Sequence, residues 1–238
     1  MSTGEEFAKE LAKQLPVKAI YDDAISPSSK QLGQLTADIL KTLQLTLAPI
    51  QALGALQDRY RAFLDQSLRR VPEPNQISPA PQILGPVIEV LRYEPEGTPI
   101  DEMFSNLLSS AMDRARAHLA HPSYPYLIKQ LSSDEAKMLI RLADKSKIYR
   151  FVQTFMLKEH RFFPEAIEMD EFPRDDLVFP ENVRFYVQRL YQLGLAGIFE
   201  TEREPTRHSD GRQNGERIRY VYRLTELGIH FMEACRPK

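Results

Sequence analysis

The side chains best able to ligate a metal or attack a substrate are few and scattered in this sequence. The chain has five histidines and a single cysteine, Cys235. His118 and His121 have a spacing that turns both to one side of a helix, but Pro122 follows directly and no further ligand is close. A structural zinc site takes four ligands and a catalytic one three. We therefore predict no metal site and no cofactor, and we expect Cys235 to be a small buried hydrophobe.

Carboxylates gather in one stretch of the second half of the chain. They are Glu165, Glu168, Asp170, Glu171, Asp175 and Asp176. Their spacing is not that of an EF-hand, and acid–base catalysis would also need a pocket and a partner base. We interpret the stretch as a solvated loop. No phosphate-binding glycine loop and no nucleophile elbow is present, so we predict no catalytic residue and no enzymatic activity.

Arginines are the remaining candidates for a functional contact, either with nucleic acid or with a protein partner. The seven are Arg184, Arg189, Arg203, Arg207, Arg212, Arg217 and Arg219. Nucleic-acid binding requires clustered positive charge that displaces counterions. Residues 131–238, however, hold 18 Lys and Arg against 18 Asp and Glu, and glutamates alternate with the arginines. Cross-strand ion pairs on a solvated hairpin are our preferred interpretation, and the two contact roles stay open.

Length and composition bound the fold. At 238 residues the chain is expected to form one large or two small domains. The apolar fraction of 42% is sufficient for a core, and the net charge of −2 excludes a bulk polycation. One cysteine excludes a disulfide framework.

The first half, residues 1–131, shows the period of amphipathic helices. One apolar stripe recurs at steps of three and four, and it consists of Leu32, Leu35, Ile39, Leu43, Leu47 and Ile50. A second broad stripe runs through residues 100–118. Between them, residues 71–86 contain five prolines and are predicted to form an extended, semi-rigid connector. We therefore expect an N-terminal helical bundle.

The second half, residues 132–238, changes character. Ser132 and Glu135 form a capping box before a helix, and residues 149–157 are typical of a strand. Residues 181–193 have a helical stripe that ends at Gly194, and a hairpin is expected at about 195–223 with an exposed tip at 205–216. Thr225 then caps a last helix. This order predicts a winged-helix-like domain with the hairpin as its wing, so the fold class is mainly α with a small β component.

Six stretches carry a family resemblance, and together they cover about Tyr21 to Cys235. In chain order they are YDDAISPSSKQLGQLTADILKTLQLTLAPIQAL, ILGPVIEVLRY, DEMFSNLLSSAMD, HPSYPYLIKQLSSDEAKML, VQRLYQLGLAGI and LTELGIHFMEAC. The most specific feature is FSNLLSSAMD followed closely by HPSY and IKQLS. The sequence resembles the Abi-alpha (abortive infection alpha) family of bacterial proteins. The resemblance implies a role in phage resistance and transfers no catalytic residue. The polar tip at 205–216 departs from the family pattern.

Three functions follow as hypotheses. We expect a non-enzymatic phage-defence component that acts through contacts with a protein partner or with itself. The first alternative is a winged-helix regulator that binds nucleic acid. The second is a membrane-acting effector that uses residues 31–57, although the polar face of that helix lacks the Lys and Arg that meet anionic lipid. No signal peptide is visible and the longest uncharged run has 16 residues, so a cytoplasmic location is expected.

Overall fold

The computed structural model describes residues 54–145 and 147–236. The chain forms two compact units, and helix α6 (Pro99–Met112) contributes to both. In the described part, the first unit contains residues 54–93 with Leu108–Pro122, and the second contains Glu94–Leu107 with residues 123–236. Most of the predicted helix at 31–57 lies outside the described residues.

The first unit contains α4 (Gly54–Arg69), the 3-10 turn η1 (Glu73–Asn75), α5 (Pro81–Val90), the end of α6 and the 3-10 turn η2 (Ala117–Leu119). Helix α5 begins inside the stretch predicted to be an extended connector. Pro81 opens this helix, where a missing N–H costs nothing. Pro86 lies in the helix interior, a position that normally costs about 3 kcal/mol. Burial of neighbouring apolar side chains, Leu84 and Val87 among them, offsets that cost.

The residues around η1 are tied to the end of α6 by backbone hydrogen bonds. The Ile77 amide donates to the Met112 carbonyl (2.9 Å), and the Arg114 amide donates to the Asn75 carbonyl (2.8 Å). A buried hydroxyl on α6, that of Ser109, donates to the Ser67 carbonyl of α4 (2.8 Å). These bonds pair backbone groups of the two segments and the buried Ser109 hydroxyl.

The second unit contains α7 (Tyr124–Ile128), α8 (Ser133–Leu142), the 3-10 turn η3 (Pro180–Asn182), α9 (Val183–Gln192) and α10 (Glu226–Cys235). The predicted capping box of α8 is confirmed, because Ser132 and Glu135 exchange hydrogen bonds of 3.2 and 2.7 Å. Gly194 follows α9 with a φ of 71°, which a residue without Cβ adopts at no cost. Thr225 caps α10 by accepting a hydrogen bond from the Gly228 amide (2.9 Å).

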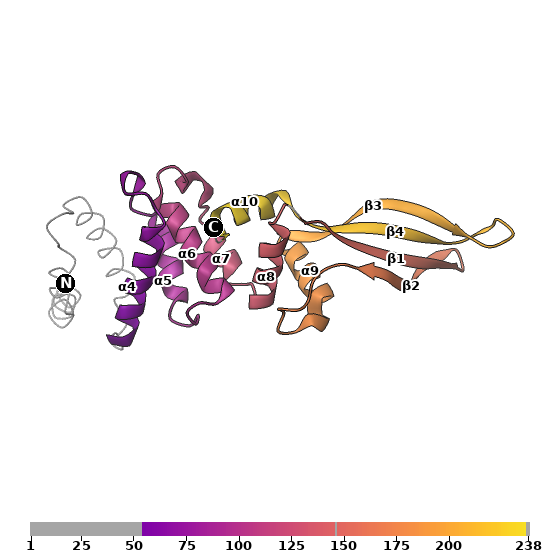
Figure 1. Cartoon of the computed structure of the whole chain (residues 1–238), viewed down its shortest axis with the longest axis horizontal. Coiled ribbons are helices and arrows are strands. Elements are labelled where there is room, and N and C mark those ends of the chain that lie inside the picture. Colours follow the sequence, from indigo (N-terminus) through magenta and orange to yellow (C-terminus); the bar gives the residue numbers. More distant parts are fainter. Residues whose placement is uncertain (1–53, 146, 237–238) are drawn as a thin grey trace, which may run out of the picture. The chain divides into compact units, whose positions relative to one another are not determined.

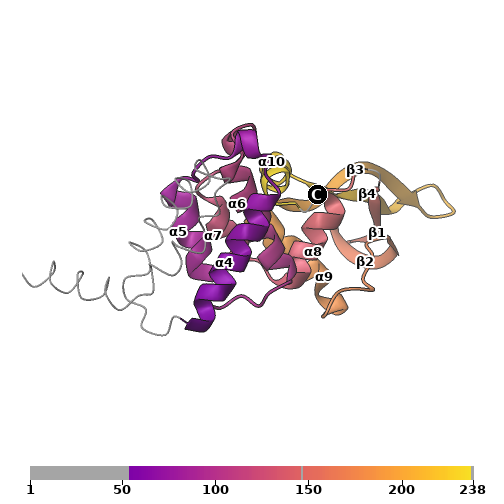
Figure 2. The same cartoon turned by 60° about the vertical axis from the view of Figure 1, so that its left-hand side comes forward.

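The described strands lie in one antiparallel sheet with the order β2-β1-β4-β3. They are β1 (Tyr149–Lys158), β2 (Arg161–Asp170), β3 (Ala196–Arg207) and β4 (Gln213–Leu224). The sheet consists of two long hairpins, β1–β2 and β3–β4, which join through β1 and β4. Figures 1 and 2 show α8, α9 and α10 at one end of this sheet and the two hairpin turns at the other.

The predicted fold class is wrong. The chain is not a mainly α protein built from an N-terminal helical bundle and a winged-helix-like domain, since its described strands form one four-stranded antiparallel sheet beside seven α-helices in the described ranges. The error arises at β2, where the sequence predicted a solvated loop. The β1–β2 turn consists of Glu159 and His160, both at positive φ (48° and 62°). Two-residue hairpin turns usually contain Asn-Gly or another glycine, which this turn lacks. Pro164 also argued against a strand, because proline is rare inside strands.

Apolar residues at the base of the sheet form the core of the second unit. Phe151 on β1 and Tyr222 on β4 lie edge to face, and Phe231 of α10 meets Tyr124 of α7 in the same way. The strands become exposed toward the hairpin turns. Over residues 54–145 and 147–236, no helix has both the length and the apolar character needed to span a bilayer.

Candidate functional site

The arginines of the β3–β4 hairpin are held by carboxylates of the same sheet. Arg203 binds Glu200 on the same strand at 2.8 Å and Glu216 on β4 at 2.6 Å. Arg219 binds Glu202 and Glu204 at 2.6 and 2.8 Å. Two cations therefore meet four anions, and their positive charge is locally cancelled.

The other candidate arginines of this hairpin are also engaged. Arg217 reaches Glu168 on β2 at 3.0 Å, and Arg212 binds Asp210 in the turn at 2.7 Å. Arg207 donates to the Gly211 carbonyl at 2.8 Å. The Thr154 and Arg217 side chains hold the pKa of the Glu168 carboxyl below its usual range. Cross-strand ion pairs, the arrangement preferred from the sequence, thus occur at Arg203 and Arg219, and acidic groups or a carbonyl engage the other three.

The two candidate arginines of α9 have different surroundings. The guanidinium of Arg184 lies 5.0 Å from the centre of the Phe151 ring, a cation–π contact. Arg189 binds Glu135 at 3.0 Å and donates to the Gln130 carbonyl at 2.8 Å. Since Glu135 also closes the capping box of α8, Arg189 ties α9 to the start of α8.

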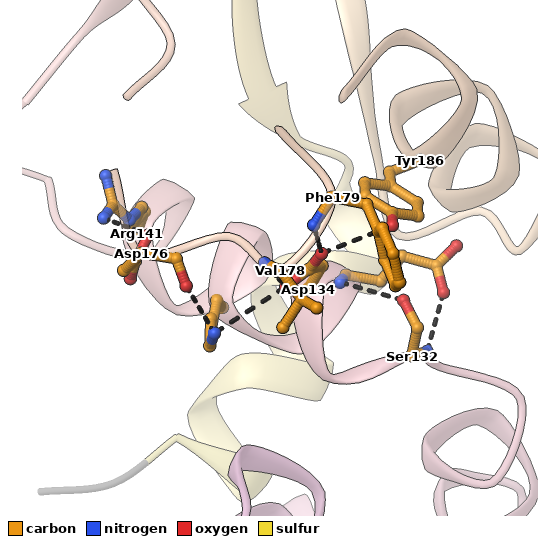
Figure 3. Close-up of polar contacts among 9 residues, drawn as sticks. Ser132, Asp134, Arg141, Asp176, Val178, Phe179 and Tyr186 are labelled. Atoms are coloured by element: carbon orange, nitrogen blue, oxygen red, sulfur yellow. Dashed lines mark hydrogen bonds and ion pairs between the residues drawn. The ribbon is translucent and has the colours of Figure 1, made fainter. Parts of the chain in front are cut away.

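A buried carboxylate, Asp134, organises the polar cluster beside this contact. Its side chain is only 3% exposed and accepts hydrogen bonds from the amides of Val178 and Phe179, at 2.9 and 3.0 Å. The Tyr186 hydroxyl donates to the same carboxylate at 3.3 Å, and Lys137 lies 3.7 Å away. Figure 3 shows these donors converging on Asp134 from the segment before α9 and from α9 itself.

The environment of Asp134 keeps it charged. Burial alone raises the pKa of this carboxyl, but the Val178 and Phe179 amides, Lys137 and Tyr186 outweigh burial and hold the pKa below its usual value of 3.8. Charge-assisted hydrogen bonds of this kind are about twice as strong as neutral ones. Asp134 is therefore an anionic anchor for the backbone at residues 178–179.

Two further side chains of α8 hold the segment before α9. Arg141 binds the Asp176 carboxylate at 2.5 Å, and Lys137 donates to the Asp176 carbonyl. Of the six acidic residues predicted to lie in a solvated loop, Glu165, Glu168 and Asp170 instead lie on β2. Asp176 is anchored to α8, so its stretch has a defined position on the helix.

The anchored segment and the first turn of α9 present large apolar side chains to solvent. Val178, Phe179 and Phe185 are 63%, 54% and 57% exposed, and all three fall within eight residues of the chain. We call these three residues the apolar surface. Aromatic side chains are enriched at the centres of protein interfaces, where they contribute most of the binding free energy.

Within residues 54–145 and 147–236, no three His, Cys, Asp or Glu side chains come together as a metal site would require. Cys235 is fully buried on α10, as predicted for a small hydrophobe.

Sequence reasoning missed the role of Asp134. An aspartate in the first turn of a helix is already expected, because the helix dipole favours a negative charge there, so the sequence carried no sign of a further role. Its amide partners lie 44 and 45 residues away, so no local pattern revealed them. The two phenylalanines close to Pro180, at positions 179 and 185, were the available sequence signal for the apolar surface.

Comparisons with known proteins place the chain at the level of a family. A family model described as "Abortive infection alpha" matches residues 51–235. Comparison with curated proteins and with solved structures found no significant match. The family match spans both compact units, including α8, β2 and the apolar surface.

Proposed function

The chain belongs to the abortive infection alpha family, and from this membership we propose that it is a non-enzymatic phage-defence component that acts through protein contacts. The observation that carries the proposal is the apolar surface on an anchored backbone. An exposed loop normally loses conformational entropy when a partner orders it. Here Asp134, Lys137 and Arg141 already fix the segment, so this cost is reduced before a partner arrives.

The composition of the surface supports a protein partner. The surface consists of Val178, Phe179 and Phe185, and charged residues such as Glu181 and Arg184 lie between them along the chain. An apolar centre inside a polar rim is the usual anatomy of a protein interface. Burying a side chain such as Phe179 is worth about 1.5–3 kcal/mol.

The test is a pull-down in which the full chain serves as bait for proteins from infected and from uninfected cells. Phe179→Ser combined with Phe185→Ser should abolish capture of any protein that the wild type retains in infected cells. Tyr126→Ser is the matched control, because Tyr126 is 56% exposed on α7, and it should retain the partner. Equal capture by both variants would refute the assignment of this surface.

Nucleic-acid binding is the alternative, and the arginine pairing argues against it. A regulator would bind duplex DNA with a steep loss of affinity between low and raised salt. Electrophoretic mobility measured at about 50 and 200 mM salt should instead show weak binding without sequence preference. Tight, salt-sensitive binding that Arg217→Gln and Arg219→Gln abolish would favour the alternative.

A further inference from the structure

The sheet has two edges of opposite chemistry. At one edge, β2 exposes Phe162, Phe163, Ile167 and Met169, each 42–48% accessible. At the other edge, the outer part of β3 carries charged residues, namely Glu200, Glu202, Arg203, Glu204 and Arg207. Figure 1 shows the two strands on opposite sides of the sheet. Charge protects an edge from pairing with another chain, whereas exposed apolar residues invite it.

Two of the charged residues on β2 have no partner among the described residues, whereas the other two have one. Glu168 binds Arg217, and Asp170 binds Arg174. Among contacts between described residues, Arg161 and Glu165 make neither an ion pair nor a side-chain hydrogen bond. Arg161 lies two residues before Phe163, and Glu165 lies two residues after it.

This spacing is self-complementary. In an antiparallel pair of identical strands centred on Phe163, that residue lies opposite its own copy, and Arg161 lies opposite Glu165 of the second chain, twice by symmetry. Directly opposed ion pairs and aromatic pairs each stabilise such a ladder. A parallel arrangement would instead oppose like charges.

We propose that two copies of this chain associate through β2, antiparallel, about a two-fold axis at Phe163. The dimer is closed, because the free edges that remain are the two charged β3 strands. Pro164 has no N–H to donate, and the register against β1 skips Glu165 and Glu168, which marks two β-bulges. The paired segment is therefore short, Arg161–Glu165, and association depends on concentration. It involves a different surface from the apolar surface and does not rest on the proposed function.

Cysteine cross-linking of the full chain tests the register. Under mild oxidation, Phe163→Cys should form a disulfide-linked dimer, since opposed positions of a two-fold strand pair bring the Cβ atoms within bonding range. Glu202→Cys, on the exposed part of β3, should stay monomeric. The native Cys235 is buried and does not interfere. Equal cross-linking of both variants would overturn the proposal.

Sedimentation equilibrium of the unmodified chain and of charge variants is the second readout. Arg161→Glu should weaken the dimer about tenfold, because two ion pairs become like-charge pairs. The double variant Arg161→Glu/Glu165→Arg should restore wild-type association. A wild-type chain that remains monomeric at every concentration, or a double variant that stays as weak as the single one, would refute this interface. Neither result would affect partner capture by the apolar surface.

Discussion

Removing the Asp134 carboxylate should release the segment before α9. In Asp134→Ala, the Val178 and Phe179 amides lose their acceptor, and the Tyr186 hydroxyl and Lys137 lose a partner. Hydrogen bonds to a charged group contribute about 1.5 kcal/mol each at the lower end of their range, so the two amide bonds amount to about 3 kcal/mol. For a chain of this length, about 3 kcal/mol lowers the melting temperature by about 6–12 °C.

Asp134→Asn should give an intermediate loss. The asparagine keeps one acceptor oxygen of similar geometry but loses the charge, and its NH2 group faces one of the two donors. We expect a loss of about 1.5–2 kcal/mol, with the Ala variant always the less stable of the two. Thermal unfolding of the purified full chain measures both.

The matched control is Asp175→Ala. Asp175 is exposed in the same segment, and among described residues it has no hydrogen bond or ion pair, so its loss should leave the melting temperature within about 1 °C. Limited proteolysis supplies a local readout, since cleavage near residues 174–179 should accelerate in Asp134→Ala alone. An Asp134→Ala variant that melts at the wild-type temperature, or one that is less stable but leaves this segment equally protected from proteolysis, would contradict the anchoring role of Asp134.

Three further predictions concern the same unit. Gly228→Ala should destabilise the chain by more than about 2 kcal/mol in chemical denaturation, because a Cβ there would lie 1.8 Å from the Leu195 carbonyl oxygen; a neutral effect would contradict the close approach. Ser132→Ala should cost about 1 kcal/mol through loss of the α8 cap, and a Glu135→Ala background should reduce that increment if the capping box is cooperative. The folded-state pKa of Asp134 lies below its ordinary value of 3.8, so the contribution of this carboxyl to stability is present above 3.8 and is lost as pH falls from 3.8 through the lower folded-state pKa. Unfolding measured from pH 6 to 2 should therefore be less pH-dependent in Asp134→Asn.

Local features of the second unit could be predicted from the sequence because their partners are close along the chain. The capping box joins two residues that are three positions apart. The positive φ that follows α9 favours glycine at position 194. The Thr225 side chain accepts a hydrogen bond from the amide three positions further on. Each of these features involves residues within about one helical turn of one another. The arginine pairing was also within reach, since alternating charges on adjacent strands neutralise one another.

The rest depended on contacts that no local pattern encodes. β2 was mistaken for a loop because its turn, Glu159-His160, lacks glycine and because Pro164 interrupts the strand. With that strand missing, the remaining order of elements suggested a winged helix. The first part of helix α5, residues 81–86, was predicted to be an extended connector because proline content outweighed the apolar spacing that begins at Ile83. The donors to Asp134 could not be recognised from the sequence, because they come from residues that only the folded chain brings next to it.

The central claim is that the apolar surface carries phage defence, and plaque formation measures this most directly. Cells expressing the wild-type chain should reduce the plating efficiency of at least one phage in a broad panel. The Phe179→Ser/Phe185→Ser variant, at equal abundance and melting temperature, should lose that protection, and Tyr126→Ser should keep it. Full protection by the Phe179→Ser/Phe185→Ser variant would contradict the role of this surface, and a panel that the wild type fails to restrict would contradict the defence function itself.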